Sequence, residues 1–108
     1  MTTLFSRQDV SLTAQEAALE VSGNLGAGVA AALAEAGQRW LERPEKPALT
    51  LDFRGVEKAS SAAISVLLQW LRACRACRIT IEQIRLSEPL QRLASLAELD
   101  ALFAQPNK

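Results

Sequence analysis

Two cysteines, Cys74 and Cys77, are the most reactive side chains of the sequence, and their C-x-x-C spacing could serve a redox couple or half of a zinc site. A structural zinc site needs about four cysteine or histidine ligands. The 108 residues contain two cysteines and no histidine. A redox cysteine gains from a helix N-terminus, whereas this pair falls near the C-terminal end of a predicted helix. We therefore interpret both cysteines as packing residues, predict no metal site, and keep a thiol enzyme as an alternative.

The other polar groups do not form a catalytic set. Asp52 and Glu57 are carboxylates at one end of a predicted sheet, but no nucleophile and base accompany them. Residues 23–28 contain a G-x-G, yet neither a Walker lysine nor dinucleotide-binding spacing follows. Without histidine, mechanisms that need imidazole are excluded. We predict no enzyme activity, no catalytic residue and no cofactor, and we assign Asp52 to ordering the loop before the next helix.

Charge and hydropathy indicate a single soluble domain spanning residues 1–108. Twelve basic side chains balance twelve acidic ones, which removes a general electrostatic reason to bind nucleic acid or an anionic membrane. No apolar run approaches the roughly 20 residues of a membrane span, and the N-terminus lacks the pattern of a secretory signal. Two cysteines suit a reducing compartment. The sequence predicts a cytoplasmic location.

The predicted elements alternate between strands and helices. Period-two patterns predict strands at 10–12, 17–22, 49–53 and 78–84, with a polar turn at 13–16 and a loop at 55–59. Helical periods predict helices at 29–41, from Ser60 or Ser61 to Ala76, and from Ser87 onward. Right-handed crossovers would make the last three strands parallel, and alternating strands fit a sheet covered on one face. The sequence predicts a two-layer α/β domain with a four-stranded mixed sheet and helices packed on one face.

The helix at 61–76 combines a polar stripe with a wide apolar arc. The stripe contains Ser61, Ser65, Gln69 and Arg72, whereas Ile64, Leu67, Leu71 and Cys74 should pack on the sheet. A second apolar flank contains Ala62, Val66, Trp70, Ala73 and Cys77. Either neighbouring helices cover this flank or part of it docks another protein. For Trp70 we favour neighbour packing, because an indole is more often buried than displayed.

Three arginines, Arg72, Arg75 and Arg78, recur at every third residue near the end of this helix. They could contact an acidic partner. Solvated arginines that complement a helix C-terminus are the commoner case, and we favour that interpretation.

Two segments resemble the STAS family, the fold shared by sulfate-transporter tails and anti-sigma-factor antagonists. Residues 49–68, Leu-Thr-Leu-Asp-Phe-Arg-Gly-Val-Glu-Lys-Ala-Ser-Ser-Ala-Ala-Ile-Ser-Val-Leu-Leu, resemble its strand, loop and helix start. Residues 19–25, Leu-Glu-Val-Ser-Gly-Asn-Leu, resemble its second strand and turn. The resemblance spans nearly the whole chain, and the STAS fold that it implies agrees with the one-faced sheet.

The resemblance implies that Ser61 stands at the phosphorylated or partner-contacting position of the family. A phosphate there would bring about −1.5 to −2 charges to a helix N-terminus, which receives anions. The sequence departs from the family pattern at Ser60, which replaces an aspartate, at Ala62 and Ala63, which replace a small residue and a glycine, and at Gly26. For Ser61 we favour helix N-capping over a phosphosite.

The chain most resembles the stand-alone, MlaB-like STAS subunit of phospholipid-transport ABC systems, which support outer-membrane lipid asymmetry in Gram-negative bacteria. The resemblance implies a non-catalytic module that sits on the ATPase subunit at the inner face of the inner membrane, reaching the membrane only through the transporter. The alternative is an anti-sigma-factor antagonist that binds an anti-sigma factor or kinase and is phosphorylated at Ser61. The predicted partner-binding residues are Ser60, Ser61, Ala62, Ala63, Ser65, Gln69 and Arg72.

Overall fold

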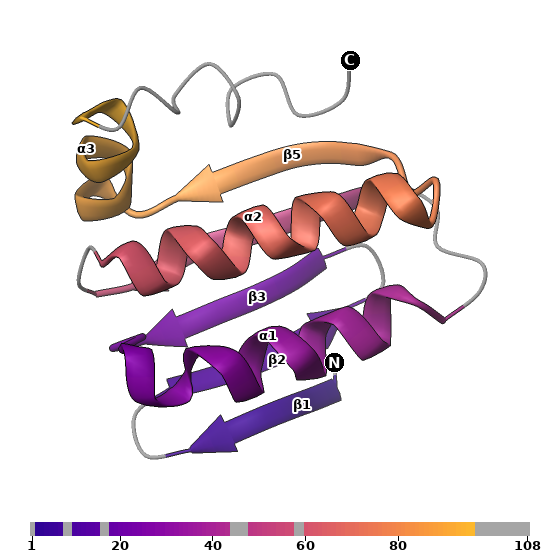
Figure 1. Ribbon diagram of the computed structural model, residues 1–108, viewed down its shortest axis with the longest axis horizontal. Coiled ribbons are helices and arrows are strands. Elements are labelled where there is room, and N and C mark those ends of the chain that lie inside the picture. Colours follow the sequence, from indigo (N-terminus) through magenta and orange to yellow (C-terminus); the bar gives the residue numbers. More distant parts are fainter. Residues whose placement is uncertain (1, 8–9, 16–17, 44–47, 58–59, 97–108) are drawn as a thin grey trace.

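A computed structural model of the chain describes residues 2–7, 10–15, 18–43, 48–57 and 60–96, and in these ranges five strands form one sheet beside three helices (Figure 1). The strands are β1 (Thr2–Arg7), β2 (Val10–Gln15), β3 (Ala18–Gly23), β4 (Leu49–Val56) and β5 (Ile81–Leu86). The helices are α1 (Ala27–Leu41), α2 (Ser61–Ala76) and α3 (Glu88–Leu96). The strands keep their chain order across the sheet.

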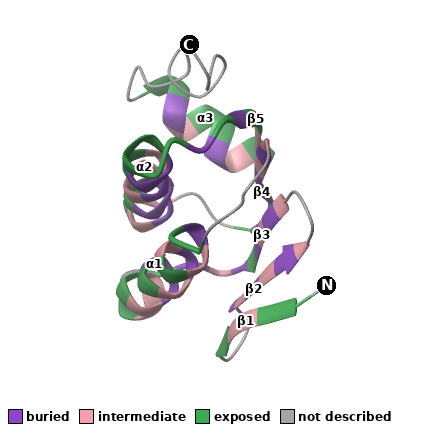
Figure 2. Cartoon of the chain, turned by 90° about the vertical axis from the view of Figure 1, so that its right-hand side faces the viewer, coloured by how far each residue is buried: buried purple, intermediate pink, exposed green. Residues whose placement is uncertain are grey.

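The sheet is mixed, and its two main helices cover one face (Figure 2). Strands β1, β2 and β3 pair antiparallel, whereas β3, β4 and β5 pair parallel. Helix α1 links β3 to β4, helix α2 links β4 to β5, and α3 packs beside α2 and β5. The two-layer α/β fold with a mixed sheet and helices on one face is therefore confirmed, including the three parallel strands.

The prediction of four strands was wrong by one, because β1 was missed. Its sequence, Thr-Thr-Leu-Phe-Ser-Arg, carries two adjacent apolar residues and no alternation. An edge strand is defined by its backbone hydrogen bonds to one neighbour and buries little, so periodicity gives a weak signal. The register of β1 also shifts between Thr3 and Phe5, a bulge that breaks the period further.

Strands β2 and β4 run further than predicted. The expected turn at 13–16 is strand as far as Gln15, with Ala14 buried in the core. The expected loop at 55–59 is strand at Gly55 and Val56, while residues 58–59 lie outside the described ranges. A Cβ atom at Gly55 would lie 2.7 Å from the Cβ of Ser22, so the close approach of β3 and β4 requires glycine here.

The end of α2 explains why β5 begins at Ile81 and not at the predicted residue 78. The N–H of Arg78 donates to the carbonyl of Arg75 (3.2 Å), and the N–H of Ile79 donates to the carbonyl of Cys74 (2.8 Å). These two bonds form a Schellman motif, in which Arg78 adopts the left-handed φ of 58° that favours glycine. Residues 77–80 thus form the end of the helix and the connection to β5.

The two faces of the sheet differ as the alternation predicted. The face toward α1 and α2 buries Leu12, Leu19, Val21, Leu51 and Phe53, each at most 1% exposed. The opposite face carries polar side chains that pair across strands, including Ser11 with Ser22 (2.8 Å) and Gln15 with Glu20 (3.0 Å). A sheet with one dry and one polar face needs no second helical layer.

Trp70 fixes the spacing between α1 and α2. Its side chain is fully buried, and its indole N–H donates to the carbonyl of Ala34 in α1 at 3.0 Å. Its ring meets the ring of Phe53 edge-on, with centroids 5.5 Å apart and planes at 63°. The predicted packing of Trp70 against a neighbouring helix is confirmed, and the outer surface of α2 is held at a fixed distance from α1.

Candidate functional site

The start of α2 is organised by Ser60, which is the N-cap residue. Its Oγ accepts a hydrogen bond from the backbone N–H of Ala63 (3.2 Å) and donates one to the carbonyl of Leu25 (2.9 Å). One hydroxyl thereby caps the helix and ties it to the connection between β3 and α1. Of the two serines predicted as possible caps, Ser60 is confirmed. The N-cap interpretation of Ser61 was wrong, because Ser61 is the first helical residue and its side chain is exposed.

The predicted partner-binding residues lie mostly on the outer surface of α2. Ser61, Ser65 and Arg72 are exposed, and Ala62 and Gln69 are half-buried. We call this set, Ser61, Ala62, Ser65, Gln69 and Arg72, the outer α2 stripe. Because Ser61 and Ser65 are exposed, the N-terminal part of the stripe is accessible to solvent in the monomer.

Ala63 and Ser60 do not belong to this open surface. Ala63 is fully buried in the core, so its methyl group is not available to a partner, and its inclusion among the contact residues was wrong. Ser60 is partly buried, and both of its hydrogen bonds serve the fold. Ser60 therefore positions the stripe through these two hydrogen bonds.

A shallow groove of about 580 Å³ runs along α1 and reaches α2 at Gln69, a residue of the stripe. It is lined by Ala31, Ala32, Glu35, Gln38, Arg39, Glu42 and Gln69. The polar side chains satisfy one another: Gln69 donates to Gln38 (2.8 Å) and Gln38 donates to Glu42 (3.2 Å). The apolar part of the lining consists of Ala31 and Ala32. These short side chains leave room for a small or flat side chain of a partner.

The sequence interpretation missed the α1 side of this groove. Ala31 is exposed and Ala32 half-buried, although both belong to an alanine-rich helix that could have been read as entirely internal. The signal was their spacing relative to Gly28 and Glu35, which places small residues on the outer face of α1.

Asp52 lies apart from the stripe, on the polar face of the sheet. Within the described ranges its carboxylate accepts from the Arg54 backbone N–H (3.0 Å) and from the Arg54 guanidinium (3.1 and 3.0 Å). Burial raises the pKa of Asp52, but the hydrogen bonds from Arg54 outweigh it and hold that pKa below its usual value. These contacts order β4 around Asp52. The predicted role of Asp52 in the loop before α2 stays a prediction, because residues 58–59 of that loop lie outside the described ranges.

The two cysteines occupy different environments at the end of α2. Cys77 is exposed, whereas Cys74 is buried, and this burial, with a smaller contribution from Cys77, raises the pKa of Cys74 to about 11. A raised pKa suppresses the thiolate that a redox or nucleophilic cysteine needs. Across the described ranges no three His, Cys, Asp or Glu side chains gather closely enough to hold a metal ion.

The raised pKa of Cys74 predicts a stability change at alkaline pH. Because folding raises this pKa from 9.0 to about 11, the protonated thiol favours the folded state below pH 9, and this contribution disappears as the pH rises toward 11. We expect the free energy of unfolding, measured by urea denaturation across this range, to fall by about 1–2 kcal/mol through this group. Cys77→Ala should keep this fall and Cys74→Ala should lose it; equal slopes in both variants would contradict the assignment.

The fold and the site define a class of protein: a two-layer α/β domain whose middle helix presents an open, hydroxyl-bearing surface. A family model described as "Mlab, STAS domain" matches residues 9–104, and the chain belongs to this STAS family. STAS domains are generally non-catalytic and mediate protein–protein interaction. No curated protein matched the sequence significantly. None of the helices in the described ranges is both long and apolar enough to cross a bilayer.

Proposed function

We propose that the chain is the accessory subunit of a phospholipid-transport ABC system and binds its ATPase through the outer α2 stripe and the adjoining groove. The match to an MlaB-type STAS domain supports the choice of system. The observation that carries the proposal is the open start of α2: Ser60 caps the helix from inside, Ser61 and Ser65 remain exposed, and the same stripe reaches the groove at Gln69. On this proposal the protein is cytoplasmic, at the inner face of the inner membrane.

The surface is suited to close contact and not to catalysis. Hydroxyl and methyl side chains at Ser61, Ala62 and Ser65 let the backbone of a partner helix approach α2 closely. The groove, which meets the stripe at Gln69, adds an apolar recess at Ala31 and Ala32. Because Ser60 and Trp70 hold α2 rigidly, little conformational freedom is lost on binding, which favours affinity.

A bulky or charged side chain on the stripe should disrupt this contact. We expect Ala62→Arg and Ser61→Asp to weaken binding to the ATPase at least about tenfold, because each brings an unpaired charge into a desolvated contact. Binding is measured by co-purification and by ATPase activity, which should fall in parallel.

Ser95 on α3 provides the control, since it is exposed on a different helix. Ser95→Arg and Ser95→Asp introduce the same groups and should bind as the parent does. If both stripe variants bind as well as the parent, the docking surface lies elsewhere.

The alternative function is an anti-sigma-factor antagonist. The exposure of Ser61 supports this alternative, because an exposed hydroxyl is accessible to a kinase. A phosphate on the first helical residue would be received by free N–H groups and the helix dipole. Mass spectrometry of the protein from stressed and resting cells distinguishes the two functions, because only the antagonist gains about 80 Da, the mass of one phosphate, at Ser61.

A further inference from the structure

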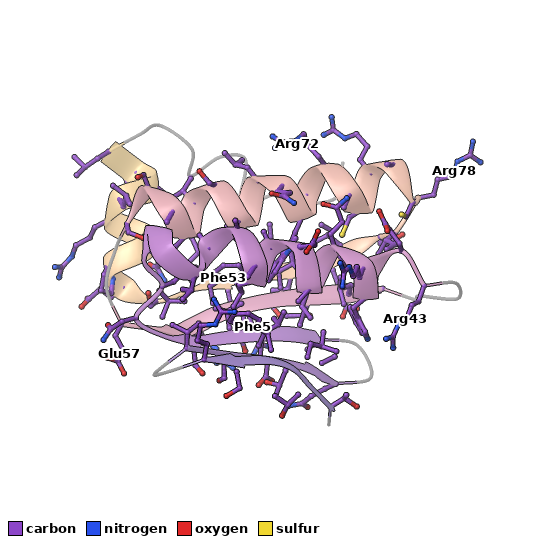
Figure 3. The ribbon with its side chains drawn as sticks, turned by 60° about the horizontal axis from the view of Figure 1, so that its bottom comes forward. Phe5, Arg43, Phe53, Glu57, Arg72 and Arg78 are labelled. Carbon is purple, nitrogen blue, oxygen red and sulfur yellow. The ribbon has the colours of Figure 1, made fainter. Side chains whose placement is uncertain are left out.

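The outer surface of α2 continues beyond Gln69 into three arginines, Arg72, Arg75 and Arg78, which we call the basic ridge. All three are exposed, and Arg72 and Arg78 project outward from α2 and its end (Figure 3). Helix α2 contains no aspartate or glutamate along its whole length. The ridge is therefore a local excess of positive charge on a chain whose net charge is zero.

The ridge contrasts with the other helical arginines of the described ranges. Arg39 pairs with Glu35 at 3.3 Å, and Arg92 pairs with Glu88 at 3.4 Å, each one helical turn away. The residue at the corresponding position before Arg72 is Leu68, and the residue three positions after it is Arg75. Like charges at this spacing repel. Among the described residues, no ion pair compensates the charges of the ridge.

Helix stability does not account for these residues. A cation in the last turn complements the helix dipole, which explains Arg75. Arg72 precedes that turn, where the dipole effect has faded. Arg78 occupies the left-handed position of the Schellman motif, where glycine would be favoured and an arginine is strained. Two of the three arginines thus stand where the isolated domain gains nothing from them.

We propose that the basic ridge binds an acidic patch on the partner protein, beside the contact made by the outer α2 stripe. The proposal rests on the proposed function and adds the chemistry of the partner surface. Arg72 belongs to both surfaces, so stripe and ridge form one continuous face of α2. Guanidinium groups bind carboxylates through two parallel hydrogen bonds, which fixes the orientation of the partner as well as attracting it.

A protein surface fits the ridge better than a lipid surface does. Anionic membranes are recognised by clusters of about four to eight basic residues, and the ridge has three next to hydroxyl and methyl groups that suit a protein contact. The neighbouring surface of α1 carries Glu35 and Glu42 together with Arg39, so it adds no net positive charge that would attract an anionic membrane.

The experiment measures the affinity of each variant for the ATPase subunit that co-purifies with the parent chain, by biolayer interferometry at several salt concentrations. We expect Arg72→Glu together with Arg75→Glu to weaken binding at least about tenfold, mostly through slower association, and to reduce the dependence on salt. Arg92→Glu is the control, a charge reversal at an exposed arginine of another helix; it breaks the ion pair with Glu88 but should bind the ATPase as the parent does. Arg78→Gly should fold more stably than the parent and yet bind more weakly.

The outcomes separate the two proposals. If the parent captures no such ATPase, the proposed function fails and the acidic-patch proposal falls with it. If the parent binds the ATPase and the double reversal binds equally well, the proposed function stands and the acidic patch is refuted. Vesicles containing about 30% phosphatidylglycerol test a membrane contact. If the double reversal loses binding to these vesicles while its binding to the ATPase in detergent is unchanged, the ridge contacts the membrane and the proposal is wrong.

Discussion

Replacing Gly37 by alanine is expected to lower the free energy of unfolding by about 2–3 kcal/mol, although alanine is the better helix former. A Cβ atom at this position in α1 would lie 2.3 Å from Cζ2, 2.5 Å from Cε2 and 2.7 Å from Nε1 of Trp70. The indole has no room to retreat, because it is fully buried and bonded to the carbonyl of Ala34. The helices must therefore separate, or the ring must leave its preferred rotamer.

Gly28 supplies a control within the same helix. A Cβ atom added there meets nothing within 4 Å, so Gly28→Ala should leave stability unchanged or raise it by up to about 1 kcal/mol. Urea and thermal denaturation of both variants compare one added methyl group in two environments. Equal stability of Gly37→Ala and the parent would show that α1 and α2 are not in tight contact. Because the groove between these helices depends on their spacing, Gly37→Ala should also weaken docking.

The strand patterns predicted the sheet because burial on one face is a local property of each strand. In β3 and β4, Leu19, Val21 and Leu51 alternate with polar residues, and every one of these apolar side chains is buried. The ends of the strands were predicted less well. Gly55 continues β4 only because β3 passes close beside it at Ser22, and this contact joins residues far apart in the sequence.

The candidate site was predicted where helical geometry alone decides exposure. The exposure of Ser61 and Ser65 follows from their positions on the helix. The same geometry places Ala63 about 200° from Ser61, on the inner side of α2. Ala63 was predicted to contact the partner because it lies in the segment that resembles the family motif, although helical geometry indicated that it is buried. Ser60 and Ser61 are both local candidates for the N-cap, and the further hydrogen bond of Ser60 to the carbonyl of Leu25, 35 residues away in sequence, could not be predicted locally.

The groove required knowledge of how two helices sit together. Gln69 and Gln38 are 31 residues apart in sequence and 2.8 Å apart at their hydrogen-bonded atoms. No periodicity within α1 or α2 predicts which faces meet. Gly37 is the exception that could have been informative, because a glycine inside an alanine-rich helix indicates a close approach by another element, here Trp70.

Trp70→Ala is expected to have the largest effect of any single substitution considered, a loss of about 3–5 kcal/mol in the free energy of unfolding. The change removes a fully buried ring, its edge contact with Phe53 and its hydrogen bond to Ala34. Since domains of this size are stable by about 5–15 kcal/mol, the variant should be marginally folded. Chemical denaturation measures the loss, with the fluorescence of Trp40 as the reporter.

Trp70→Phe keeps the prediction testable if the alanine variant does not fold. It retains an aromatic ring beside Phe53 but removes the N–H that donates to Ala34, so we expect a loss of about 1–2 kcal/mol. The smaller ring also frees the space that a methyl group at Gly37 would occupy. In a double-mutant cycle, Gly37→Ala should therefore destabilise the Trp70→Phe background by at least about 1 kcal/mol less than it destabilises the parent. Strictly additive losses would show that the two residues do not share one packing contact.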